Sequence, residues 1–176
     1  MSIKPIRHSA NAGFTLMEVL VAAVVLGIGI LGLVTMMVTS MKSNQSSFYR
    51  SIASSLAYNM ADRIRKNSDQ AKLGAYDGID TSGTIPSDPN CITSLSGCTP
   101  SNLAIEDIRE WAENFTNVNS ATNYVPSLPN GIGTVTRNTT TNQFTITVTW
   151  NDSDWDSSNL TQRTATTGTL SLKMSL

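Results

Sequence analysis

Alternate carboxylates at Asp152, Asp154 and Asp156 could hold a calcium ion, because this hard cation prefers oxygen ligands. An EF-hand loop would next need glycine at its sixth position and glutamate at its twelfth, where this sequence has Ser157 and Arg163. The EF-hand pattern therefore fails. A looser calcium site between two strands stays open beside the simpler interpretation, a solvated acidic hairpin loop.

A second acidic group, which includes Glu106, Asp107 and Glu110, has the residue types of a catalytic carboxylate pair. Its spacing is that of a polar helix face, so we expect a solvated surface instead. The single histidine, His8, lies near the start of the chain, and the rest has no histidine to act as a general base. The sequence shows no glycine-rich phosphate loop, nucleophile–base pair or metal-ligand cluster. It therefore predicts no catalytic residue, no cofactor and no dedicated metal centre.

Cys91 and Cys98 are the two cysteines of the chain. In an exported domain, which meets an oxidising compartment, we expect them to form a disulfide that closes a short loop. A zinc site would need further cysteine or histidine ligands nearby, and the sequence provides none.

An apolar segment near the N-terminus, residues 14–38, is the next feature of the sequence. Residues 19–34 contain no polar side chain, and residues 14–38 together exceed the roughly 20 residues that cross a bilayer as a helix. Lys4 and Arg7 precede the segment, so the positive-inside tendency keeps the N-terminus cytoplasmic and exports the rest. Glu18 lies inside the segment, where a carboxylate costs a few kcal/mol unless it has a partner.

Two simpler interpretations explain less. A secretory signal peptide would have a shorter apolar region followed by its cleavage site, whereas the candidate site Gly13-Phe14 precedes the apolar run. A plain single-span anchor accounts for the hydropathy but leaves the cost of Glu18 without a reason.

The run Gly13-Phe14-Thr15-Leu16-Met17-Glu18-Val19-Leu20 resembles the processing site of type IV prepilins and type II secretion pseudopilins. The resemblance implies that a prepilin peptidase removes a leader, residues 1–13, by cutting after Gly13 and then methylates the new amino terminus at Phe14. It also implies that Glu18 pairs with the N-terminal amine of a neighbouring subunit. Such pairing would recover much of the cost of two charges in apolar surroundings and would set subunit register.

Helical periodicity continues after the apolar segment. Apolar residues recur at steps of four from Phe48 through Ile52, Leu56, Met60 and Ile64. We therefore expect one long helix over residues 14–66, with a transmembrane half at about 14–38 and a second half that packs on a head formed by residues 67–176.

The head reads as a small sheet with one covering helix. Glycine and proline make residues 67–100 loop-like, and a helix is predicted to start near Pro100 and to present Ala104, Ile108 and Trp111 on one face. Alternation then predicts strands at 133–137, at 144–150 and at 170–176, with a hairpin loop at 138–142. A long helix followed by an antiparallel sheet is an α+β, type IV pilin-like fold.

A narrower resemblance covers most of the chain outside residues 67–100. The segment 44–65, the Ile108–Trp111 helix, the turn at 128–133 and the strand end Val148-Thr149-Trp150 resemble PilV-type minor pilins, also called type IV pilus modification proteins. The resemblance implies a structural subunit that primes pilus assembly and sits at or near the tip, supporting twitching motility, adhesion or DNA uptake. A pseudopilin of a type II secretion system is the alternative.

The resemblance also implies partners and location. The expected partners are prepilin peptidase, other minor pilins, the major pilin, the inner-membrane assembly platform and membrane lipid. The chain would sit in the bacterial inner membrane with its head in the periplasm, and later in the surface pilus. A formal net charge of -1 gives no argument for a nucleic-acid partner.

Overall fold

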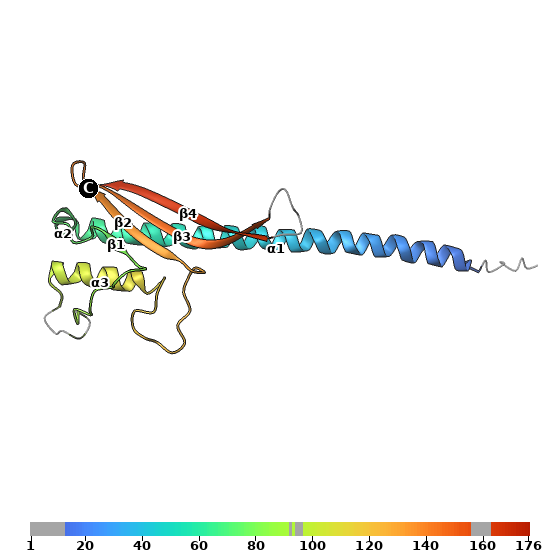
Figure 1. Ribbon diagram of the computed structural model, residues 1–176, viewed down its shortest axis with the longest axis horizontal. Coiled ribbons are helices and arrows are strands. Elements are labelled where there is room, and N and C mark those ends of the chain that lie inside the picture. The colour runs from blue at the N-terminus through green and yellow to red at the C-terminus, as the bar shows by residue number, and fades with distance from the viewer. Residues whose placement is uncertain (1–12, 92, 94–96, 156–162) are drawn as a thin grey trace, which may run out of the picture. The chain divides into compact units, whose positions relative to one another are not determined.

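The computed structural model describes residues 13–91, 93, 97–155 and 163–176. It divides into two compact units, Met1–Ser43 and Asn44–Leu176. The described residues form, in chain order, the elements α1 (Leu16–Lys66), α2 (Ser68–Lys72), β1 (Ile79–Asp80), α3 (Pro100–Ala112), β2 (Ile132–Asn138), β3 (Gln143–Trp155) and β4 (Arg163–Ser175) (Figure 1). The long helix α1 belongs to both units.

In the first unit, the apolar surface of α1 faces outward. Every residue from Gly13 to Met41 is exposed. The most apolar window of α1 has a mean hydropathy of 2.7, and the helix is long and apolar enough to cross a membrane. An exposed apolar surface of this length is a signature of contact with lipid or with other proteins.

The second unit contains one four-stranded antiparallel sheet in the order β1-β2-β3-β4. The predicted hairpin is present, because Asn138 pairs with Gln143 on either side of the turn. Alternation places Phe144, Ile146 and Val148 on the buried face of β3. The predicted α+β fold, a long helix with a small antiparallel sheet, is therefore confirmed.

One hydrophobic core joins α1, α3 and the sheet. The second half of α1 buries Ala53, Leu56, Ala57, Met60, Ala61 and Ile64. From α3, the buried Trp111 donates its indole N–H to the carbonyl of Leu56, with 3.0 Å between the two atoms. This bond satisfies the polar atom of a large apolar side chain and ties α3 to α1.

The structure corrects two expectations. Phe48, expected on the buried stripe of α1, is 61% exposed, so the buried part of the stripe starts further along the helix. The stretch from Asn67 to Pro100, expected as loop, contains α2 and the two-residue strand β1. Both elements are too short to give a periodic signal.

Gly133 on β2 leaves room for aromatic rings from the segment that covers it. A Cβ at this position would lie 2.8 Å from Phe115 Cε2 and closer still to the ring of Trp111. We expect Gly133→Ala to lower the free energy of unfolding by about 1–3 kcal/mol, because overpacking forces the rings off their rotamers. Urea unfolding of the full chain in detergent, followed by tryptophan fluorescence, measures this. Thr136→Ala on the outer face of the same strand is the control, and an equal effect of both changes would contradict the expectation.

Candidate functional site

The N-terminal residues form the first candidate site. Gly13 and Phe14 precede α1, and the Phe14 side chain is 82% exposed. The helix starts with a local cap: the amide of Glu18 donates to the hydroxyl of Thr15 at 3.3 Å and to its carbonyl at 3.1 Å. The Gly13–Phe14 peptide bond therefore lies outside the helix, with both residues exposed.

Glu18 is the third residue of α1 and is exposed on its apolar surface. A threonine followed three residues later by a glutamate is the capping-box pattern of helix starts. The sequence-based prediction considered only the pairing of Glu18 with another subunit and missed Thr15. The signal was present in the spacing Thr15-x-x-Glu18. An acidic residue in the first turn also complements the helix dipole.

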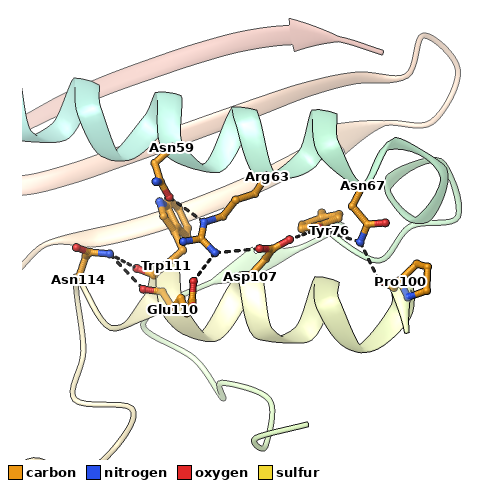
Figure 2. Close-up of polar contacts among 9 residues, drawn as sticks. All are labelled: Asn59, Arg63, Asn67, Tyr76, Pro100, Asp107, Glu110, Trp111 and Asn114. Carbon is orange, nitrogen blue, oxygen red and sulfur yellow. Dashed lines mark hydrogen bonds and ion pairs between the residues drawn. The ribbon is translucent and has the colours of Figure 1, made fainter. Parts of the chain in front are cut away.

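A polar network between α1 and α3 is the main side-chain cluster of the second unit (Figure 2). The Nη1 atom of Arg63 lies 2.9 Å from Asp107 Oδ1 and 2.7 Å from Glu110 Oε2. Its Nε donates to Asn59 Oδ1 at 2.9 Å. One guanidinium therefore bridges two helices through three oxygen acceptors.

The network continues from Asp107 to the end of α1. Tyr76 donates its hydroxyl proton to Asp107 Oδ2 at 2.6 Å, and Asn67 Nδ2 donates both to the Tyr76 hydroxyl at 3.2 Å and to the Pro100 carbonyl at 2.7 Å. Burial, and then the hydrogen bond to Asp107, raise the pKa of Tyr76. Burial lowers the pKa of Arg63, but its hydrogen bonds to Glu110 and Asp107 outweigh this effect and raise it overall.

The acidic group on α3 is not a uniform solvated face, and that expectation was wrong for Asp107. Asp107 is buried at 8% exposure and accepts from Arg63 and Tyr76, whereas Glu110 is exposed. Burial, followed by the charges of Asp88 and Glu110, raises the pKa of Glu106. Asp107 serves here as a structural acceptor, because each of its oxygens is used by a neighbouring side chain.

Cys91 and Cys98 form a disulfide, with their Cα atoms 5.0 Å apart. The bond closes a short loop between β1 and α3. Because Thr99 caps α3 directly after this loop, accepting from the Asn102 amide at 3.2 Å, the disulfide lies next to the start of that helix.

Asp152 and Asp154 lie in strand β3, so the expectation of a hairpin loop was wrong for these two residues. The strand continues to Trp155 and pairs Asp152 with Thr166 and Asp154 with Thr164. Asp152 Oδ2 accepts from the Ser46 hydroxyl of α1 at 2.6 Å. Asp156 lies outside the described residues. Within the described part of the chain, no group of three or more potential metal ligands occurs.

Comparison with known proteins finds a short motif at the N-terminus. Residues 8–39 match the prokaryotic N-terminal methylation motif. No curated protein and no solved structure matches the chain. The match spans Gly13, Phe14 and Glu18, and the first half of α1 is an exposed apolar helix. Together the motif and the helix support a type IV pilin or pseudopilin: a membrane-anchored structural subunit that prepilin peptidase processes and that assembles with other pilins.

Proposed function

We propose that this chain is a minor pilin, a structural subunit without catalytic activity that helps prime type IV pilus assembly and sits at or near the pilus tip. In this role it supports twitching motility, adhesion or DNA uptake. The observation that carries the proposal is the methylation motif at residues 8–39, placed at the start of a helix whose apolar residues are all exposed as far as Met41. Such a helix first needs lipid and then the equivalent helices of other subunits around it.

Each segment of the chain has its own place and role during assembly of the filament. Residues 1–13 are a leader that stays on the cytoplasmic side, residues 14–38 span the inner membrane, and residues 67–176 form a periplasmic head on the helix that ends near residue 66. Prepilin peptidase cuts after Gly13 and methylates Phe14. The mature subunit then passes from the membrane, through the assembly platform, into a filament of minor and major pilins.

We expect the mature chain to begin at N-methylated Phe14. The residues of the proposed cleavage site are exposed, so the peptidase needs no unfolding of the described helix. Mass spectrometry of the membrane-extracted protein measures the terminus directly. Gly13→Leu is expected to retain the leader, because a bulky side chain replaces the small residue of the prepilin pattern, while Gly29→Leu, a matched change inside the apolar run, is expected to leave cleavage intact. Any other native terminus would reject the pilin assignment.

The alternative is a pseudopilin of a type II secretion system. Both classes share the leader and the apolar helix, so the choice rests on the head. The residues that favour the pilus are those of the PilV-type resemblance, and two of them, Arg63 and Trp111, fasten α3 to α1. Deleting the gene and scoring surface pili against protein secretion separates the two: loss of pili with normal secretion supports the minor pilin, and the reverse supports the pseudopilin.

A direct role in DNA binding is not part of the proposal. Arg63 and Arg65 of α1 and Arg137 of the head each form ion pairs with acidic side chains, which reduces the positive charge they present. Without a basic stripe, no electrostatic footprint for nucleic acid is present on these residues. A shift of DNA by the full chain in a gel at modest salt would contradict the expectation that the chain does not bind DNA directly.

A further inference from the structure

A cleft with a volume of about 680 Å³ opens in the second unit, between the two connections that precede and follow α3. One wall is the segment directly after β1, residues 81–87, and the other is the start of the connection from α3 to β2, residues 115–118. Gly131 and Ile132, where β2 begins, complete the lining together with Arg109 of α3. Ligand pockets in proteins have volumes of about 300–1,000 Å³, so the cleft is large enough for a small molecule.

Hydrogen bonds within the chain hold both walls in place. On the first wall, the amide of Thr81 donates to the carbonyl of Gly133 at 3.0 Å, and the amide of Gly133 donates to the hydroxyl of Thr81 at 2.8 Å. On the second wall, Glu113 Oε2 accepts from the Val118 amide at 3.1 Å and from Asn119 Nδ2 at 3.3 Å. Walls that are ordered without a ligand lose little conformational freedom on binding, which favours affinity.

Arg109 joins the two walls and is the single charged residue in the lining. Its Nη1 donates to the carbonyl of Pro86 at 2.6 Å, and its Nη2 donates to Asn119 Oδ1 at 3.0 Å. A guanidinium has five N–H donors, and among the described residues these two oxygens are the acceptors bonded to it. Three N–H groups are therefore left for an acceptor that enters the cleft.

Hydroxyl groups and apolar side chains make up much of the remaining lining. The hydroxyls of Thr84 and Ser87 on the first wall and of Thr116 on the second form no hydrogen bond with any residue that the structure describes. Apolar contact comes from Phe115, whose ring is buried, and from Ile132, which is 37% exposed. The cleft thus offers one cation, several unpaired hydroxyls and an apolar patch.

These groups determine the chemistry of the ligand. A carboxylate matches a single guanidinium, because its two oxygens accept from the N–H groups of one arginine. A doubly charged anion is less suitable, since Glu106 and Glu113 lie three positions before and four positions after Arg109 and reduce the positive charge around it. Ligand hydroxyls would bond the unpaired hydroxyls of the walls, and a ring with C–H groups would cover the apolar patch. A sugar acid combines all three features.

We propose that this cleft binds a hexuronate, a six-carbon sugar acid. Its carboxylate accepts from Arg109, its hydroxyls bond Thr84, Ser87 and Thr116, and the C–H face of its ring packs on Ile132. The inference goes beyond the proposed function, because the cleft needs neither the leader nor the filament. A native terminus other than Phe14 would reject the pilin function and leave this site in place.

Ligand-observed NMR titration of the full chain in detergent micelles tests the chemistry. The probes are D-glucuronate, D-galacturonate and D-mannuronate, and at least one is expected to bind with a dissociation constant of about 1 mM or below. The hexose of the same configuration lacks the carboxylate, and cyclohexanecarboxylate lacks the hydroxyls. Each of these controls is expected to bind at least about tenfold more weakly. No saturable binding by any of the three probes, or equal binding by either control, overturns the proposal.

Matched variants test the location. Arg109→Gln removes the charge and is expected to weaken binding at least about tenfold, whereas Arg65→Gln, the same change in an exposed ion pair of α1, is expected to leave it unchanged. Because Arg109 also joins the walls, Thr116→Val is a second variant, which removes only an unpaired hydroxyl and keeps the size of the side chain. It is expected to weaken binding roughly three- to fivefold, and Thr136→Val, on the exposed face of β2, is its control.

Unfolding midpoints of the four variants show that each is folded. If Arg109→Gln is not, the comparison of Thr116→Val with Thr136→Val decides. Unchanged binding by a folded cleft variant, or an equal loss in its control, overturns the site in this cleft. The trisaccharide of the uronate that binds then identifies the source: binding at least as tight as that of the monomer supports a unit of a polysaccharide, and exclusion supports the free sugar acid.

Discussion

A Glu18→Ala chain is expected to fold its head and to be cut after Gly13, yet to enter filaments at a small fraction of the wild-type level. Glu18 is exposed on the apolar surface of α1, four positions after the proposed new amine at Phe14. Among the apolar helices of a filament, removing one charge leaves the other unpaired, which costs a few kcal/mol. Each 1.4 kcal/mol corresponds to about a tenfold change in occupancy. Immunoblots of sheared filaments against the membrane fraction measure the ratio.

A matched variant separates this role from helix capping. Glutamine, like glutamate, serves at the third position of a capping box, so Glu18→Gln keeps the start of α1 and loses only the charge. If pairing with Phe14 matters, Glu18→Gln is expected to be excluded from filaments almost as strongly as Glu18→Ala. If capping alone matters, Glu18→Gln is expected to assemble normally, and Thr15→Ala to reproduce the defect of Glu18→Ala. The second pattern would remove the role in subunit register.

Patterns of apolar residues predicted most of the fold. The second half of α1, α3, the β2–β3 hairpin and β4 all have a period close to their observed structure, because each of them has one face toward the core and one toward solvent. The disagreement over Phe48 has the same origin. Periodicity shows which face of α1 is apolar, but not where along the helix the head begins to cover it.

The polar network could not be read from the sequence in the same way. Arg63 and Asp107 are separated by 44 positions in the sequence. Other charged residues lie beside each of them, and the sequence does not distinguish which would pair. Only the antiparallel packing of α3 against α1 brings Asp107, together with the more exposed Glu110, to Arg63, and it leaves Asp62 outside the network. The N-terminal site is different: Gly13, Phe14 and Glu18 lie within one six-residue segment, so a linear motif suffices to propose them.

Replacing Asp107 with alanine is expected to have the largest effect on the stability of the head, a loss of about 2–4 kcal/mol of unfolding free energy. The change removes the acceptor of the fully buried Tyr76 hydroxyl and one of two carboxylates that hold Arg63. Glu110 still accepts from Arg63 at 2.7 Å, so part of the pairing is retained. The tyrosine hydroxyl has no such substitute for its proton, because Asn67 donates to it.

The control for this change is Asp62→Ala, which removes the same side chain from an exposed pair. Asp62 contacts Arg65 three residues further along α1 at 3.0 Å, with both side chains more than half exposed. Exposed pairs of this kind contribute about 0.5 kcal/mol or less. Urea unfolding of the full chain in detergent compares the two variants, and Asp107→Asn is expected to fall between them, because its amide keeps one acceptor oxygen but carries no charge. Equal losses for Asp107→Ala and Asp62→Ala would mean that the network adds no more than a surface ion pair, and that apolar packing alone holds α3 against α1.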